Sequence, residues 1–418
     1  MTDLHDLSTT QLLAQFASRT LSPLDYYEHL LAHVGRWEPH IRALYAFDPE
    51  QVRLQARAAT ERWNKGAPNG PLDGIPVTIK ELIATQGTPI PLGSAATTLK
   101  PALQDAPPAA RMREAGAIIL AKTTVPDFGM LSSGLSSFHG ITRNPWNTAC
   151  NTGGSSSGAA AAAAAGYGPL HIGTDIGGSV RLPAAWCGLV GFKPTLGRIP
   201  IDPYYTGRCA GPMTRSVDDA VLLMRHLARP DARDATSLPP LTGEWSDAPV
   251  SVNGLKIGLM LEPGAGLQPE GFVCAAVEQA ARLFESHGAQ VRTLAPIMDR
   301  AQLDGLDRFW RARQWAELSA LGAEQFAKVL PYIRDWAAPG ADLSGVEAVQ
   351  GFNQTFEMRR RAAQVFSEFD LVLSPTNQIN HFPAQWPSPS NDPQQPFEHI
   401  VFTLPWNCLL YTSPSPRD

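Results

Sequence analysis

The sequence has no long apolar run and no block of like charge. No apolar stretch reaches 18 residues without a charged or turn-forming residue, so we predict no membrane-spanning helix. Lysine and arginine number 34 against 39 aspartates and glutamates, a net charge of −5. Because dedicated nucleic-acid-binding proteins are usually basic, this balance argues against that class. The first residues are polar and acidic and do not resemble a secretory signal.

Cysteine is scarce as well. The five cysteines are odd in number and scattered, and their spacing fits neither a disulfide framework nor a metal site. We therefore expect a cytoplasmic protein with no metal site. Apolar residues make up 44% of the chain, and this fraction is enough to build a core, which excludes a disordered protein.

Helical and strand-like patterns alternate along the chain. Ser8-x-x-Gln11 has the form of a capping box, and Ser22-Pro23 has the form of an N-cap followed by a first-turn proline. The predicted helices include about Pro49–Trp63, Pro108–Ala115, Ala159–Ala165, Asp307–Leu321, Ala323–Trp336 and Gly345–Phe369. The predicted buried strands are Ile75–Lys80, Ala117–Lys122, Leu170–Ile172, Leu189–Phe192, Leu255–Leu261 and Leu371–Leu373. Strands separated by helices predict an α/β fold with a mixed or parallel sheet covered on both faces.

Two loops rich in glycine and serine flank the alanine helix, at Gly153–Gly158 and Gly173–Arg181. Small residues let consecutive backbone N–H groups converge on an anion or a developing oxyanion. Flexible turns are the simplest alternative. A phosphate loop is disfavoured, because no Gly-Lys-Ser/Thr follows the glycines. A nucleophile elbow centred on Ser156 needs a strand just before it, and residues 144–152 carry a proline, three asparagines and no apolar run.

The segment from Gly153 to Pro194 resembles the signature of the amidase signature family. Further matches follow in family order: GIPVTIK at 74–80, RNPW at 143–146, GPMTR at 211–215 and FTLPWN at 402–407. The resemblance implies a large mixed β-sheet covered by helices on both faces, within one amidase domain over residues 1–407. Inside that domain we expect N-terminal helices (1–66), a signature core (67–228), a surface linker (229–252) and an incomplete C-terminal part (253–407).

The resemblance also implies hydrolysis of a carboxamide by a Ser–Ser–Lys triad, with no cofactor. At the matching positions, Ser179 is the nucleophile, Ser155 the bridging serine and Lys80 the base. A lysine accepts a proton only when it is neutral, so its pKa must fall well below about 10.4. Burial among apolar side chains lowers the pKa of a lysine in this way, and apolar residues surround Lys80 in the sequence. In the family, the peptide bond before the bridging serine is cis.

Other family positions carry expected supporting roles. The oxyanion hole falls on the backbone N–H groups of Ile176, Gly177 and Gly178 and of the nucleophile itself. We expect Asp175 and Arg181 to brace the loop by hydrogen bonding, with Ser156 in a supporting role. Tyr204 and Tyr205 follow the signature, and they either contact the acyl group of the substrate or pack in the core.

The family contains both free-standing amidases and the A subunit of the tRNA-dependent amidotransferase. That subunit usually has Lys-Asp-Asn at the base motif, where this chain has Lys80-Glu81-Leu82. We therefore expect an amidase that acts on a small-molecule amide and binds neither a membrane nor a nucleic acid. The sequence leaves open whether it forms a homodimer. The amidotransferase subunit is the alternative, and it alone would bring partner chains and charged tRNA.

The resemblance stops abruptly at Asn407, in the middle of a family motif. Residues 408–418 read CLLYTSPSPRD, and one codon choice per residue spells a transposon-end adaptor used in sequencing libraries. We therefore expect a non-native read-through tail at 408–418, and a natural protein that continues past Asn407.

Overall fold

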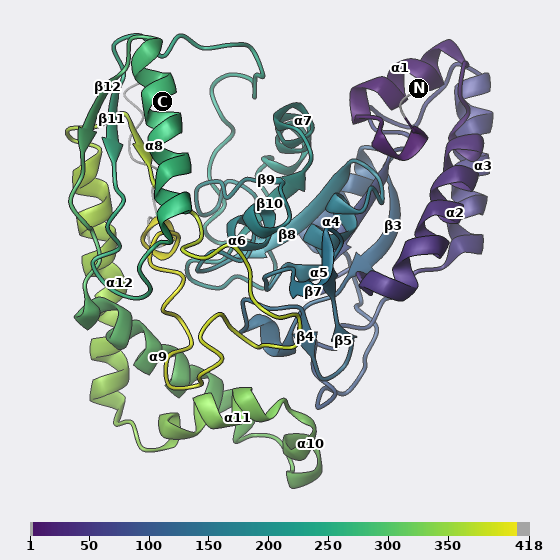
Figure 1. Ribbon diagram of the computed structural model, residues 1–418. Helices are drawn as coiled ribbons and strands as arrows, with labels where there is room; N and C mark the ends of the chain where they lie inside the picture. Colours follow the sequence, from purple (N-terminus) through teal and green to yellow (C-terminus); the bar gives the residue numbers. More distant parts are fainter. Residues whose placement is uncertain (1–2, 408–418) are drawn as a thin grey trace. The chain divides into compact units, whose positions relative to one another are not determined.

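A computed structural model describes residues 3–407, so the predicted tail at 408–418 lies outside the described residues. The chain divides into two compact units. The first comprises residues up to Asp175, together with Ser179–Asp247 and Pro383–Gln385, and the second comprises Ile176–Gly178, Ala248–Phe382 and residues from Trp386 onward. Figure 1 shows the elements of both units.

A six-stranded mixed sheet forms the centre of the first unit, with strand order β1-β3-β2-β8-β10-β9. Its strands are β1 (Leu44–Tyr45), β2 (Pro76–Lys80), β3 (Ile118–Thr123), β8 (Leu170–Asp175), β9 (Val190–Gly191) and β10 (Cys209–Thr214). Strand β2 runs parallel to both β3 and β8, whereas β10 runs antiparallel to β8 and β9. The predicted α/β class with a mixed sheet is confirmed.

Helices and two hairpins complete the first unit. The helices are η1 (Leu4–Asp6), α1 (Thr9–Ser18), α2 (Pro23–Ile41), α3 (Pro49–Asn64), α4 (Pro107–Glu114), η2 (Asp127–Gly129), α5 (Ser157–Ala164), α6 (Arg181–Trp186) and α7 (Val217–Leu227). The hairpin strands are β4 (Leu135–Ser136), β5 (Gly140–Ile141), β6 (Arg143–Asn144) and β7 (Asn147–Asn151). Ser8 and Ser22 cap α1 and α2 with their side chains, as the capping patterns predict.

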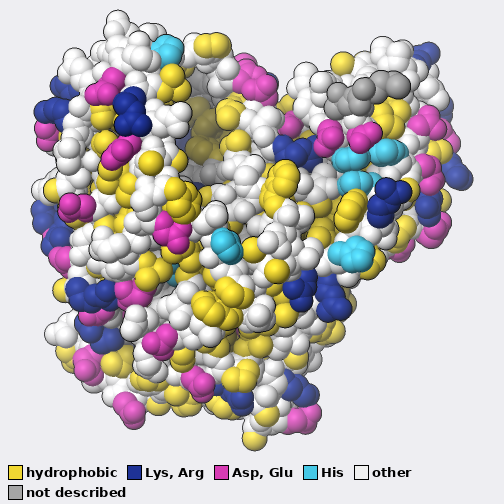
Figure 2. Space-filling view, in the orientation of Figure 1, with side chains coloured by type: hydrophobic (Ala, Val, Ile, Leu, Met, Phe, Trp, Pro, Cys, Tyr) yellow, Lys and Arg dark blue, Asp and Glu magenta, His cyan; other side chains and the backbone are white. Residues whose placement is uncertain are grey.

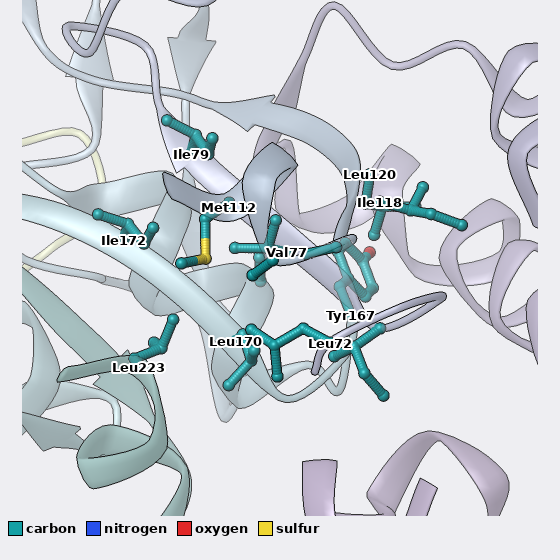
Figure 3. Close-up of a cluster of buried hydrophobic side chains, with 14 of the residues drawn as sticks. Leu72, Val77, Ile79, Met112, Ile118, Leu120, Tyr167, Leu170, Ile172 and Leu223 are labelled. Carbon is teal, nitrogen blue, oxygen red and sulfur yellow. The ribbon is translucent and has the colours of Figure 1, made fainter. Parts of the chain in front are cut away.

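Alternation along β2 divides the sheet between an apolar core and a polar face. Val77 and Ile79 pair with Leu170 and Ile172 of β8, and all four lie in one buried cluster. Figure 3 shows this cluster, which also takes side chains from α4 (Met112) and α7 (Leu223). Since successive side chains of a strand point to opposite faces, Thr78 and Lys80 lie on the face away from this cluster. Burying each large apolar side chain contributes roughly 1.5–3 kcal/mol.

The second unit contains a three-stranded parallel sheet and most of the C-terminal helices. Its strand order is β12-β11-β13, with β11 (Lys256–Leu259), β12 (Gln290–Thr293) and β13 (Leu371–Leu373). Its helices are α8 (Gly271–Ser286), α9 (Arg300–Leu318), α10 (Ala323–Lys328), α11 (Pro331–Ala337), η3 (Ala338–Ala341), α12 (Gly345–Val365) and η4 (Leu404–Trp406). The predicted burial of β13 is wrong, since it is an edge strand and Leu371 is 42% exposed.

Several predicted boundaries differ from the structure for identifiable reasons. The helix predicted over Ala323–Trp336 is two helices, because Pro331 forces Leu330 into an extended conformation (ψ 133°). Helix α9 starts seven residues earlier than predicted, since Asp299 caps it through a capping box. The sequence patterns did not predict the helices α6, α7 and α8 or the strands β1, β4, β5, β6, β7, β10 and β12.

No helix within residues 3–407 is long and apolar enough to cross a membrane. Acidic and basic side chains are interspersed over the face that Figure 2 shows, in keeping with the absence of like-charge blocks from the sequence. The histidines on this face gather mainly over the N-terminal helices, where His5 stacks on His33 with ring centroids 3.9 Å apart.

Candidate active site

Lys80 is the last residue of β2, and it lies fully buried in the first unit. Its ammonium nitrogen lies 2.8 Å from Ser155 Oγ, 2.9 Å from Ser156 Oγ and 3.3 Å from the carbonyl oxygen of Thr174. The three partners come from two segments more than 70 residues away in the sequence. Strand β2 places Lys80 among them because it pairs directly with β8, which ends in Thr174 and Asp175.

The two serines occupy the turn that leads into α5. The peptide bond between Gly154 and Ser155 is cis, and both serine side chains are buried. Ser156 Oγ donates to Thr174 O (3.1 Å) and accepts from Thr174 N (3.2 Å). Ser156 is therefore held by the sheet and is fully buried, which does not suit the exposed nucleophile of an elbow.

One premise of the sequence analysis is corrected here. A strand does precede this turn, because Asn147–Asn151 forms β7. It pairs with β6 in a two-stranded hairpin and does not belong to the six-stranded sheet. Asparagine side chains stabilise this hairpin locally, as where the Asn144 side chain accepts from Trp146 N, so it forms without an apolar run.

Ser179 lies in the loop between β8 and α6. Its carbonyl oxygen accepts a hydrogen bond from Ser156 N (3.2 Å), which joins the two Gly/Ser-rich segments. The loop is closed by Asp175, whose carboxylate accepts from Val180 N (3.0 Å) and from the Arg181 guanidinium (2.8 and 3.0 Å). The structure thus brings Lys80 together with Ser155 and Ser156, and it holds the loop that carries Ser179 against the same turn.

Burial controls the charge of this cluster. Desolvation lowers the pKa of Lys80 to about 7, while the negative charge of Asp175 partly opposes the shift and Arg208 adds to it. Burial alone would raise the pKa of Asp175, but the charge and hydrogen bonds of Arg181 outweigh it and hold that pKa below its ordinary range. A substantial fraction of Lys80 is therefore neutral at pH 7 while Asp175 stays ionised.

Ile176, Gly177 and Gly178, the predicted oxyanion segment, belong to the second unit by their contacts. A Cβ on Gly177 would lie 3.3 Å from Ile400 Cδ1, which is tighter than most Cβ contacts, so the Ile400 side chain would have to shift by a few tenths of an ångström. The hydroxyl of Thr403 donates to the carbonyl oxygen of Gly177 at 2.5 Å. The sequence analysis did not assign a role to Thr403, although it lies in the FTLPWN segment that matches the family.

The two predicted substrate-binding tyrosines lie in the segment after the signature. Tyr204 is 38% exposed and its hydroxyl lies 3.3 Å from Thr206 Oγ1, so it is not a core residue. Tyr205 is half-buried, and its carbonyl oxygen accepts from Arg208 N (3.0 Å). Arg208 also lines a cavity of about 10 Å³ beside Thr174, which brings this segment close to the carbonyl that accepts from Lys80.

Two other buried bases have partners of their own. His171 lies beside β2, but its ring nitrogens lie 2.8 Å from Thr78 Oγ1 and 3.0 Å from Gly168 O. Burial lowers the pKa of His171 to about 3, so it stays neutral. Lys122 is buried too, with its pKa lowered to about 7 by desolvation, and its ammonium group donates to Ile83 O and Thr85 Oγ1. Neither residue contacts a serine of the cluster.

Sequence reasoning also missed a buried acid–base pair next to Lys80. Glu81 Oε2 lies 2.7 Å from His139 Nε2 and accepts from Gly93 N (2.9 Å). The sequence shows Glu81 directly after Lys80, but no local pattern indicates that it pairs with His139, 58 residues further along the chain. Within residues 3–407, one group of potential metal ligands converges, Asp3 with His5 and Asp6, and it shares no residue with the Lys80 cluster.

Comparison with known proteins identifies the family of the chain. The family model for amidases matches residues 25–335. The chain therefore belongs to the amidase family, whose members include the amidase signature enzymes, and it is a hydrolase of that class.

Individual relatives fall into two groups. An acylamidase of Rhodococcus erythropolis is 33% identical over 97% of this chain and 87% of its own length. The A subunit of the glutamyl-tRNA(Gln) amidotransferase of Chloroflexus aggregans is also 33% identical, over 97% of this chain and 88% of its own. Among solved structures, a bacterial aryl acylamidase of the amidase signature family superimposes with a TM-score of 0.88 at 28% identity, covering 98% of this chain and 89% of the other.

Proposed function

We propose that the chain hydrolyses a small carboxamide to a carboxylate and ammonia or an amine, with Ser179 as nucleophile, Ser155 as relay and Lys80 as base. The observation that supports this most is the buried Lys80, whose Nζ lies 2.8 Å from Ser155 Oγ. With a pKa lowered to about 7 by burial, this lysine can accept a proton at neutral pH.

Acylation begins with two linked proton transfers. Neutral Lys80 takes the hydroxyl proton of Ser155 as Ser155 takes the proton of Ser179, and Ser179 Oγ attacks the amide carbon. The carbonyl oxygen becomes an oxyanion, for which we assign the backbone N–H groups of Ile176, Gly177 and Gly178 as donors. When the tetrahedral intermediate collapses, the C–N bond breaks and the leaving nitrogen takes a proton from Ser155, which regains one from protonated Lys80.

Deacylation repeats the sequence with water as the nucleophile. Water gives a proton through Ser155 to Lys80 and adds to the ester carbon of the acyl-enzyme. Collapse expels Ser179, which regains a proton by the same route, and the carboxylic acid leaves as a carboxylate. Asp175 and Arg181 act by position, because their ion pair closes the loop that carries the nucleophile.

The names of two relatives support the choice of substrate class. Two proteins similar to this chain are named acylamidase and aryl acylamidase, and we therefore include acylated aryl or alkyl amines, together with primary amides, in the proposed substrate range. The exposed ring of Tyr204, in the segment beside Thr174, would suit contact with an aryl or apolar acyl group.

The A subunit of a tRNA-dependent amidotransferase is the second candidate, since such a subunit is equally identical to this chain. The residue after the base separates the two candidates in part. Here it is Glu81, whose carboxylate is engaged by His139 and Gly93 N, where the Lys-Asp-Asn motif usual in that subunit has aspartate.

An assay of the purified chain alone, without ATP, tRNA or partner chains, tests the proposal. The substrates are benzamide, hexanamide, p-nitroacetanilide and L-glutamine, and the readout is released ammonia or nitroaniline. We expect turnover of at least one of the first three substrates and none by the Ser179→Ala variant. Release from glutamine alone would favour the amidotransferase subunit, and turnover that survives Ser179→Ala would contradict the mechanism.

A further inference from the structure

A second, larger cavity lies in the first unit, away from the residues that the proposed mechanism uses. It has a volume of about 770 Å³, within the ~300–1,000 Å³ typical of small-molecule sites. It is formed by the C-terminal end of α2, the strands β5 and β6, and the last turn of α5. Its lining includes Trp37, Arg42, Arg143, Trp146, Ala164 and Ala165.

The lining combines cations with indole rings and has no acid. Arg42 and Arg143 provide two guanidinium groups, and neither aspartate nor glutamate lines the cavity. Arg143 Nη1 donates to Thr148 O (2.7 Å), whereas the guanidinium of Arg42 has no hydrogen bond or ion pair among residues 3–407 and is exposed. The lining of the cavity is thus positively charged, and the Arg42 guanidinium is accessible to an anion.

The indole ring of Trp146 is held in place, and both indole rings are exposed. Trp146 Nε1 donates to Cys187 O (2.9 Å), and its backbone N donates to Asn144 Oδ1 (3.0 Å). Nevertheless, Trp146 is 74% exposed and Trp37 is 46% exposed. A fixed, solvent-facing indole offers a flat surface on which a planar ring can stack with little loss of side-chain freedom.

The end of α5 opposes an anion only weakly here. The last carbonyls of a helix carry partial negative charge, but Ala163 O accepts from Arg215 Nη1 (3.2 Å) and Ala165 O lies 2.6 Å from His33 Nε2. With these two carbonyls partnered, the end of α5 opposes a bound anion less.

We propose that this cavity binds a small aromatic carboxylate, with its ring against Trp146 and Trp37 and its carboxylate on the guanidinium groups of Arg42 and Arg143. A planar carboxylate matches the fork of a guanidinium in two parallel hydrogen bonds. The RNPW segment, which includes Arg143 and Trp146, thus has a ligand-binding role. This inference does not depend on the proposed amidase activity.

Calorimetric titration of the whole chain with naphthalene-2-carboxylate tests the inference. Arg42→Gln and Arg143→Gln should each raise the dissociation constant at least tenfold. Arg36→Gln, which removes an exposed arginine of α2 outside the cavity, should leave it within about twofold. Should Arg143→Gln disturb the β6–β7 hairpin, Arg42→Gln decides alone, because that side chain carries no structural hydrogen bond.

Two further probes distinguish the contribution of the carboxylate from that of the aromatic ring. Naphthalene-2-methanol lacks the charge and inorganic phosphate lacks the ring, so each should bind at least tenfold more weakly than the carboxylate. Equal binding of either probe, or an affinity that Arg42→Gln leaves unchanged, would overturn the inference. Amide hydrolysis by Arg42→Gln should stay at the parent rate, so a failure of this inference is distinguishable from a failure of the proposed function.

Discussion

Replacing Lys80 by methionine should make the stability difference between variant and parent depend on pH, and this difference should favour the variant most at low pH. The lysine deprotonates near pH 7 in the folded protein and near 10.4 in the unfolded chain. Between these values the unfolded chain binds more protons, so the free energy of unfolding rises with pH across that window, and below about pH 7 the full penalty of the buried charge applies. At 1.36 kcal/mol per unit, the penalty is about 5 kcal/mol at pH 6 and about 2 kcal/mol at pH 9.

Methionine fills a similar volume and carries no charge. It also removes the hydrogen bonds to Ser155, Ser156 and Thr174 O, at a cost of roughly 1–3 kcal/mol for each unsatisfied buried group. Because that cost does not change with pH, the stability difference between Lys80→Met and the parent should favour the variant by about 3 kcal/mol more at pH 6 than at pH 9.

Urea unfolding at several pH values between 6 and 9 measures this difference. Lys122→Met is the matched control, since its lysine is equally buried and has a pKa of about 7 but no serine partner. Both variants should show the same trend with pH, whereas only Lys80→Met should lose amide hydrolysis. A stability difference for Lys80→Met that does not vary with pH would mean that Lys80 stays charged when folded, and the base assignment would be refuted.

Three further outcomes follow from the same geometry. The kcat/KM of the parent should rise with pH up to about 7 and then level off, as Lys80 loses its proton, and a profile that falls over this range would contradict the assignment. Ser155→Ala should lower kcat by ~10²–10⁴-fold. Ser157→Ala should lower it much less, because the Ser157 hydroxyl donates to Thr124 O and not to the Lys80 cluster. Equal losses of kcat in the two variants would argue against a relay through Ser155. Thr403→Val should lower kcat ~10-fold with KM nearly unchanged, since we expect the Thr403 hydroxyl to orient the Gly177–Gly178 peptide. Thr403→Ser keeps the hydroxyl and should restore kcat. An unchanged kcat in Thr403→Val would leave Thr403 without a positioning role.

Local features of the sequence predicted the fold well where the interactions are local. The Ser8 and Ser22 caps form as expected, since each involves residues within one helical turn. The start of α9 was equally readable from Asp299 and Gln302, although the predicted helix begins only at Asp307. The division at Pro331 has a local cause as well. A proline restricts the conformation of the residue before it, and here this restriction outweighs the hydrophobic periodicity.

Contacts between distant residues could not be predicted in the same way. The apolar run predicted a buried strand at Ile75–Lys80, but the contacts of Lys80 with Ser155 and Thr174 depend on β2 lying beside β8 in the sheet. The pairing of Glu81 with His139 and the hydrogen bond from Thr403 to Gly177 join residues 58 and 226 positions apart. No local pattern encodes such pairs, because they form only when the tertiary structure brings the segments together.

The identity of the nucleophile is the central claim, and covalent labelling tests it most directly. The purified chain is treated with a fluorophosphonate that reacts with activated serines, and the modified residue is located by peptide mass spectrometry. The account predicts a single adduct on Ser179, absent from Ser179→Ala and much slower to form in Lys80→Met. An adduct on Ser156 in its place would contradict the account and support the nucleophile elbow.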